Sequence, residues 1–195
     1  MKILSIIALI ATSVMFTNCS SSNMMAGNPN KTVMVGGAEM YPTKNIVENA
    51  VNSADHTTLV AAVKAAGLVE TLSGPGPFTV FAPTNAAFSK LPAGTVETLV
   101  KPENKKTLVH ILTSHVVAGR MSGADLMNMM KAGNTTLTTV SGHKLMLSKM
   151  NGGIMLTDEK GGTAMVTIAN VFQSNGVIHV VNSCLLYTSP SPRDS

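Results

Sequence analysis

Five histidines are the side chains of this sequence with the chemistry for metal binding or proton transfer. His56, His110 and His143 lack the short spacing that places metal ligands on one helix or one hairpin. Only the tertiary fold could bring them together, and the sequence leaves that case open. The pattern itself predicts no metal site and no bound cofactor.

The other two histidines lie among apolar residues. His115 completes a helical face that repeats at i, i+3, i+4 and i+7 from Leu108. His179 lies inside an apolar strand pattern. A histidine in such a place is usually a core residue whose ring nitrogens bond to backbone groups. We therefore predict core roles for both, with ligand binding or a pH switch as the alternative.

Nucleophilic catalysis would need a serine or cysteine held by a base and an orienting acid. No serine lies in the Gly-x-Ser-x-Gly turn of hydrolases, and no glycine-rich loop of the phosphate-binding kind is present. The acids Asp158 and Glu159 lie in a glycine-containing segment that is typical of a solvated turn. We therefore predict that the protein is not an enzyme.

Methionine is unusually frequent, with 14 in the sequence. Four lie close together beyond residue 120, and thioether sulfur is a ligand that suits Cu(I). On a helix, Met127 and Met130 would share a face while Met129 would point elsewhere. We favour flexible core filling and keep a carrier of Cu(I) or of a small apolar ligand as the alternative function. The cluster consists of Met121, Met127, Met129 and Met130.

The N-terminus has the pattern of an export signal. Lys2 precedes an apolar run over residues 3–16, and Cys19 follows, succeeded by small polar residues. We predict a signal peptide over residues 1–18 and a lipid on Cys19, which would be the only attachment to a membrane. The expected location is the periplasm, the outer membrane as a lipoprotein, or the medium. If Cys19 carries no lipid, it could pair with Cys184 in an oxidising compartment.

The rest of the chain divides into a tether, one domain and a tail. Residues 19–42 are rich in Ser, Asn, Met and Gly and are predicted to be a flexible tether. The domain is predicted to occupy residues 43–186, and residues 187–195 to be an unstructured tail that is foreign to it or an artefact of the sequence. Helical patterns fill the first half of the domain and β-prone runs the second, which predicts an α+β fold.

Two stretches of the domain carry a recognisable pattern. Residues 78–88 form an apolar strand that ends at a proline and continues into a helix with a capping residue. Residues 175–182 begin with Asn-Gly and continue as a second apolar strand. In this order and separation they resemble the paired motifs of the fasciclin domain family. The matching residues are Thr79, Phe81, Ala82, Pro83, Thr84, Asn85, Phe88, His115, Asn175, Gly176, Ile178 and His179.

The resemblance implies a wedge-shaped β-sandwich with flanking helices. It also implies a non-enzymatic module for adhesion or binding outside the cytoplasm, with a protein, a matrix component or a polysaccharide as partner. The helix between the motifs often carries a Tyr-His pair in that family, and here the pair is Ser114-His115. Nucleic acid is not expected as a partner, because the formal charge of +4 is scattered and forms no Lys/Arg cluster.

Overall fold

A computed structural model describes residues 30–185 of the chain. The predicted signal peptide, Cys19 and the predicted tail from residue 187 lie outside the described residues. Within residues 30–185, no helix is both long enough and apolar enough to span a membrane.

A seven-stranded sheet forms the centre of the molecule, in the order β4-β3-β9-β8-β7-β6-β5. Neighbouring strands are antiparallel except β3 and β9, which run parallel with Phe81 opposite His179. The two motif stretches are therefore adjacent strands. The strands are β3 (Phe78–Pro83), β4 (Val116–Ala118), β5 (Thr136–Thr138), β6 (Lys144–Met150), β7 (Gly153–Thr157), β8 (Thr163–Gln173) and β9 (Gly176–Val181).

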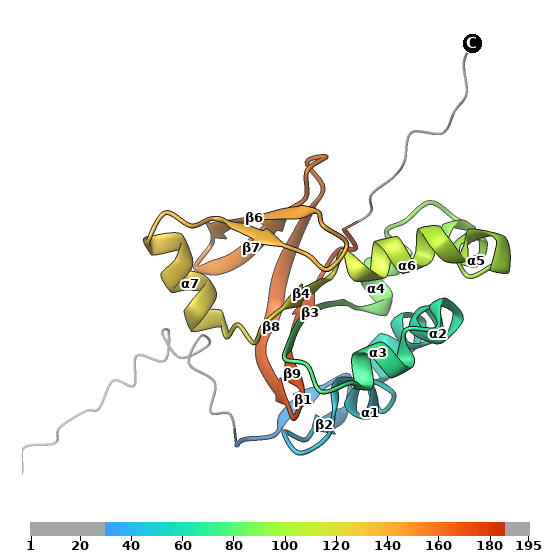
Figure 1. The fold of residues 1–195 in the computed structure, drawn as a ribbon, viewed down its shortest axis with the longest axis horizontal. Helices are drawn as coiled ribbons and strands as arrows, with labels where there is room; N and C mark the ends of the chain where they lie inside the picture. The colour runs from blue at the N-terminus through green and yellow to red at the C-terminus, as the bar shows by residue number, and fades with distance from the viewer. Residues whose placement is uncertain (1–29, 186–195) are drawn as a thin grey trace, which may run out of the picture.

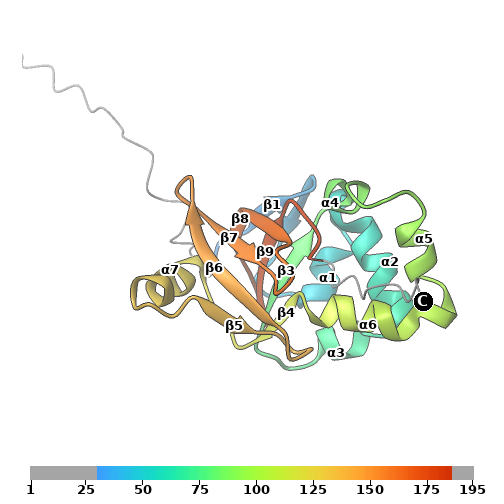
Figure 2. The ribbon, with the colours of Figure 1, turned by 90° about the horizontal axis from the view of Figure 1, so that it is seen from above.

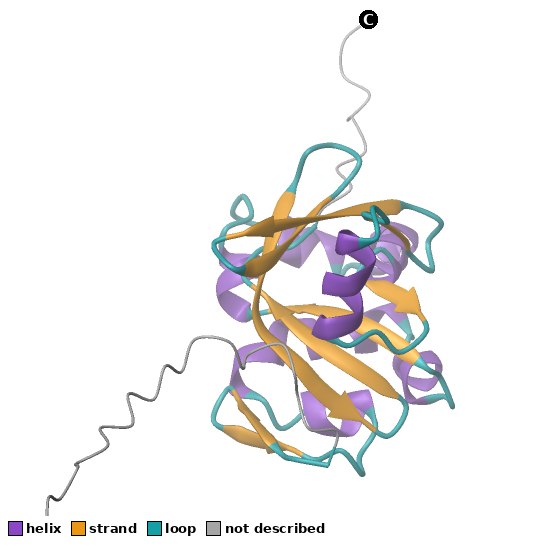
Figure 3. Ribbon diagram, turned by 90° about the vertical axis from the view of Figure 1, so that its left-hand side faces the viewer, coloured by secondary structure: helices purple, strands orange, loops and turns teal. Residues whose placement is uncertain are grey.

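The sheet bends along β8, whose 11 residues pair with β7 at one end and with β9 at the other. Its register against β9 shifts twice, and Asn170 takes a φ of 63° there. Such bulges increase the local bend of a strand. The two outer edges of the sheet consequently meet, with Val117 bridging Thr139. Figure 3 shows the two halves of the bent sheet lying across one another.

Most helices precede the strands of the second half, which confirms the predicted α+β order. Six of them gather beside β3 and β9, whereas α7 lies at the opposite side of the sheet (Figures 1 and 2). Sequence-local caps fix several boundaries: Asn45 forms a capping box with Glu48, and Gly67 ends α2 in the left-handed conformation. The helices are α1 (Ile46–Ala50), α2 (Thr57–Ala66), α3 (Val69–Ser73), α4 (Asn85–Ser89), α5 (Thr95–Leu99), α6 (Lys105–Thr113) and α7 (Gly123–Lys131), with 3-10 turns η1 (Ala54–His56) and η2 (Pro102–Asn104).

Two hydrophobic cores result, and β3 contributes to both. Val80 and Ala82 pack with the helices, while Phe81 packs inside the bend of the sheet with residues of β5, β6 and β7. This placement explains why the strand is apolar on both faces, because both of its faces are covered.

The prediction of a flexible tether as far as residue 42 is wrong for residues 33–40. They form a hairpin of β1 (Val33–Val35) and β2 (Ala38–Met40), and Val35 and Met40 are buried in the helical core. Gly36 takes a φ of 56° at the turn and accepts a hydrogen bond from the Ala54 N–H. The Gly-Gly pair therefore makes a tight turn rather than a linker, because glycine adopts positive φ without strain.

Candidate functional site

Thr79 of the first motif and His179 of the second meet at the loop that joins β4 to α7. The buried Thr79 hydroxyl donates to the Gly119 carbonyl (2.6 Å) and accepts from the Met121 N–H (2.9 Å). From the neighbouring strand, His179 Nε2 donates to the Met121 carbonyl (2.8 Å). The two strands thus hold both backbone polar groups of Met121, which satisfies groups that burial would otherwise make costly.

His179 is fully buried and its ring is stacked on Phe81, with ring centroids 5.6 Å apart. Its Nδ1 accepts from the Asn170 N–H (3.4 Å), so the network assigns the proton to Nε2. Desolvation lowers the pKa of His179 to about 4, although the Met121 carbonyl acts in the opposite direction. A neutral ring bonded at both nitrogens acts as a structural connector.

His115 has an equivalent role at the end of α6. Its Nδ1 donates to the Ile111 carbonyl (2.8 Å), and its Nε2 accepts from the Leu185 N–H (3.0 Å). The ring therefore joins α6 to the chain that follows β9. Burial lowers the pKa of His115, against smaller opposing effects of the Ile111 carbonyl and the Asp158 charge.

Cys184 lies beside His115, with Sγ 3.7 Å from Nε2. This contact does not make an activated nucleophile, for two reasons. Desolvation raises the pKa of the Cys184 thiol to about 12, and the thiolate is the reactive form. In addition, the Nε2 lone pair that would take the thiol proton already accepts from Leu185.

The polar residues at the end of the first motif act as caps. The Thr84 hydroxyl accepts from the Ala87 N–H (3.2 Å) and caps α4, while Pro83 ends β3 opposite Val181. Asn85 caps a different helix: its Oδ1 accepts from the Thr58 N–H (3.0 Å) at the start of α2. Sequence spacing could identify the Thr84 cap, because it is local, but not the cap that Asn85 provides 27 residues away.

Asn175 connects three backbone segments through one side chain. Its Oδ1 accepts from the Ile46 N–H (3.0 Å), and its Nδ2 donates to the carbonyls of Leu72 and Gly74 (2.8 Å each). The start of α1 and the end of α3 are thereby fixed to the start of β9. At Gly176, an added Cβ would collide with the Phe78 carbonyl oxygen, so the close approach of β3 and β9 requires glycine.

The remaining apolar residues of the predicted set, Ala82, Phe88 and Ile178, belong to the helical core. The four clustered methionines all pack against the core inside the bent sheet. That Met129 points away from Met127 and Met130 stays a prediction. Among residues 30–185, no group of three or more His, Cys, Asp or Glu side chains is arranged to hold a metal ion.

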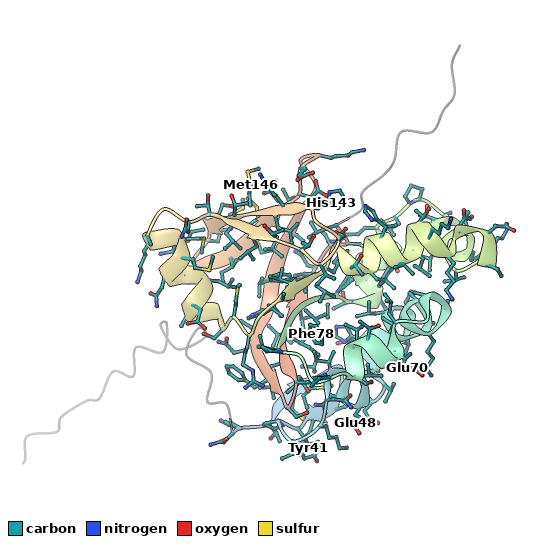
Figure 4. The ribbon with its side chains drawn as sticks, viewed as in Figure 1. Tyr41, Glu48, Glu70, Phe78, His143 and Met146 are labelled. Atoms are coloured by element: carbon teal, nitrogen blue, oxygen red, sulfur yellow. The ribbon has the colours of Figure 1, made fainter. Side chains whose placement is uncertain are left out.

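A different set of methionines, none of them among the predicted residues, lies on the outer side of β6, β7 and β8. Met146 and Met150 are 49% and 47% exposed, and Figure 4 labels Met146 on this outer side. Cross-strand pairing places Ser148 opposite Met155 and Met155 opposite Met165 on the same side. We call Met146, Met150, Met155 and Met165 the methionine face. The alternation of these residues with buried Leu145 and Leu147 was the available signal.

An apolar cavity of about 70 Å³ lies between the helices and the sheet. Residues of α1, α2, α3, α6, β3 and β9 contribute to its wall, including Phe78, which Figure 4 labels. Val116 of β4 lines it as well, and no sequence pattern could reveal the cavity, because its wall comes from seven separate elements. Its lining includes Ile46, Val60, Leu68, Leu72, Phe78 and Leu112.

Comparison with known proteins gives consistent matches. The family model described as "Fasciclin domain" matches residues 54–187. "Protein sll1483" of Synechocystis sp. is 46% identical over 156 residues, which cover 80% of this chain and 81% of that protein. "Cell surface glycolipoprotein MPB83" of Mycobacterium bovis is 31% identical over 166 residues, 83% of this chain and 67% of that protein.

Among solved structures, a FAS1 domain pair from the insect cell adhesion molecule Fasciclin I superimposes with a TM-score of 0.67. The match covers 75% of this chain and 52% of that one, at 18% sequence identity. At that identity the likeness concerns the fold alone.

Proposed function

The chain belongs to the fasciclin domain family, and we propose that it is a non-enzymatic module that binds a partner outside the cytoplasm. The family consists of adhesion and cell-surface proteins, and a cell-surface glycolipoprotein is among the relatives of this chain. The proposal includes export, with Cys19 as the site of a lipid anchor.

The polar side chains of the motifs support a non-enzymatic role, because they are occupied by structural hydrogen bonds. Thr79, His115, Asn175 and His179 each hydrogen-bond to backbone groups of other segments. Side chains with these bonds position the chain but do not reach a substrate. The Cys184 thiol, held in its neutral form, adds no nucleophile.

The methionine face is the observation that carries the binding proposal. It presents flexible thioether side chains over three adjacent strands, and such side chains adapt to the shape of a partner. Met146 and Met150 leave about half of their surface in water, so covering them would release apolar area. Lys144 is exposed on the same strand and on the same side as Met146, and it gives the face a basic edge. An acidic protein or an anionic polysaccharide would complement it.

The test is retention of envelope proteins and matrix polysaccharides by the immobilised full chain. Met146→Glu combined with Met150→Glu should abolish retention, because each change places a charge where the partner would cover apolar surface. The matched control is Val51→Glu combined with Val100→Glu, at two positions that are 48% and 36% exposed away from this face. Equal retention by both double variants, or no retention by the wild-type chain, would refute the proposal.

A second function, carriage of a small apolar ligand, is supported by the cavity between the helices and the sheet. Its wall is mostly aliphatic, and pockets that take small apolar molecules are lined in this way. The volume of about 70 Å³ suits a small ligand, or part of a longer one that extends outwards.

An apolar fluorescent probe distinguishes this second function. Val60 lines the cavity and is half-buried, so Val60→Trp should fill it and abolish probe binding. Val51→Trp is the control, because Val51 is exposed and does not line the cavity. Probe affinity that is the same in both variants would exclude this cavity as the binding site.

A further inference from the structure

Two histidines that are 33 residues apart in the sequence meet at the surface. His110 lies on α6 and His143 in the turn between β5 and β6, where Figure 4 labels it. Their Nε2 atoms are 2.6 Å apart, and the rings stand edge to face with centroids 4.7 Å apart. Both residues are half-buried and in reach of solvent.

Glu159 contacts the His143 ring at Nδ1, the nitrogen that does not face His110. Its Oε2 is 3.3 Å from His143 Nδ1, while its Oε1 accepts from the Lys144 N–H (3.0 Å). Glu159 is exposed, and an exposed glutamate carboxylate is charged at neutral pH. A charged acceptor at Nδ1 assigns the proton to that nitrogen and turns the Nε2 lone pair of His143 towards His110.

A carboxylate that holds the far nitrogen of a histidine is the usual outer partner of a metal-binding imidazole. With the proton of His143 on Nδ1, the hydrogen bond between the two Nε2 atoms takes its proton from His110. A metal ion can bind between the two Nε2 atoms if that single proton of His110 moves from Nε2 to Nδ1, so that both Nε2 lone pairs face the metal. Zn²⁺ binds imidazole nitrogen at about 2.0–2.1 Å, so the two Nε2 atoms would need to separate to about 3.3 Å. Small rotations of two half-buried rings can supply that change.

The charged groups around this place balance, so the imidazole nitrogens, and not the net charge, select a cation here. Asp158 lines a small cavity of about 20 Å³ together with His143 and Glu159. Its Oδ2 is buried and has no hydrogen-bond partner within residues 30–185. Lys160 lines the same cavity and Lys144 lies beside it in sequence, so the two carboxylates face two ammonium groups.

We propose that His110 and His143 bind a divalent ion of the Zn²⁺ class between their Nε2 atoms, with Glu159 as the residue that positions His143. The sequence pattern predicted no metal site, but it left open a site formed by residues that only the tertiary fold brings together. Two protein nitrogens leave coordination positions on the ion for water or for a group from a bound partner. The inference does not depend on the methionine face.

Calorimetric titration of the full chain with Zn²⁺, without a polyhistidine tag, tests the site. The wild-type protein should bind one equivalent. His110→Gln and His143→Gln should each abolish the binding of this equivalent of Zn²⁺. Glu159→Gln should still bind one equivalent, with an affinity for Zn²⁺ that is roughly 10- to 100-fold weaker. Glu103→Gln, which removes the same charge from an exposed position in η2, should leave affinity unchanged.

Imidazole nitrogen NMR of the wild-type chain gives a readout that a folding defect cannot imitate. Zn²⁺ should shift the Nε2 signals of His110 and His143 together and leave those of the buried His115 and His179 in place. In Glu159→Gln, the Nδ1 signal of His143 should change before any metal is added. A chain without one saturable equivalent, or a doubly substituted His110→Gln, His143→Gln chain that still binds, would overturn the proposal.

Discussion

Single side chains at this fold's junctions each satisfy several backbone groups. Asn175 accepts from α1 and donates twice near the end of α3, and Thr79 accepts and donates within one loop. A buried amide or hydroxyl bonded in this way costs little to bury, but removing it leaves several groups without partners. The motif therefore marks the connections between elements, and changes at these residues should act on stability.

Gly176 gives the sharpest test of this view at one position. Gly176→Ala would bring a methyl group against the Phe78 carbonyl oxygen and the Ile46 side chain, forcing β3 and β9 apart. We expect a loss of about 1–3 kcal/mol or more in the free energy of unfolding, measured by urea denaturation. Gly153→Ala is the control, because its added methyl would make an ordinary 3.5 Å contact with the Met150 carbonyl. Similar midpoints for both variants would contradict the close pairing of the strands.

His179 predicts a pH dependence of stability. Its pKa falls from 6.5 to about 4 on folding, so the unfolded chain takes up the proton first as the pH is lowered. The contribution of this group is complete above pH 6.5 and is lost as the pH falls towards 4, by about 1.4 kcal/mol per pH unit within that window.

Denaturation midpoints measured between pH 7.5 and pH 4.5 check this slope. In His179→Gln, which can still donate to the Met121 carbonyl, the slope should be shallower than in the wild-type chain. His115 shifts in the same direction and remains in both proteins. Parallel slopes would mean that His179 is not held neutral.

At the scale of elements, local signals predicted the first motif well and missed the hairpin β1–β2. The run 78–83 is apolar throughout and Thr84 follows it as a local cap, so strand and helix start were predictable. In the hairpin, each strand has only three residues, and the Gly-Gly turn has the composition of a linker. Burial against α1 and the end of β8 stabilises it, and such distant contacts leave no local signal.

Val35 tests whether the hairpin is part of the domain. It is 3% exposed, whereas its neighbour Met34 is 57% exposed on the same strand. Val35→Ser should lower the free energy of unfolding by about 1–3 kcal/mol, through lost burial and a buried hydroxyl. Met34→Ser should have almost no effect. Equal melting temperatures for the two variants would mean that the hairpin does not pack on the domain and that residues 33–40 are a tether after all.

At the scale of the whole molecule, some faces of the sheet are buried and one is left exposed to solvent. The helices cover β3 and β9 on one side, and the bend of the sheet closes over Phe81 and its neighbours. The outer side of β6, β7 and β8 remains exposed, with Met146 and Met150 on it. The sequence could predict which residues are apolar, but not that these methionines share one face, since strand register decides that. The meeting of His110 and His143 likewise depends on the bend.

Substitution of Phe81 tests whether the two hydrophobic cores unfold together. It is fully buried inside the bend and stacks on His179. Phe81→Ala should cost about 3–5 kcal/mol, because it removes a large side chain and leaves a cavity. Thermal unfolding should remain a single transition at a lower temperature. A near-wild-type midpoint would show that the bent half of the sheet is not packed as described.

The central claim is that the motif residues support the fold and the methionine face makes the contact. Methionine oxidation by dilute peroxide, followed by mass spectrometry of the full chain with and without its retained partner, tests it most directly. We predict that the partner slows oxidation of Met146 and Met150 at least severalfold. Met34, which is 57% exposed on the hairpin, serves as the internal control and should oxidise at an unchanged rate. Oxidation of Met146 and Met150 at equal rates in free and bound chains would contradict the account.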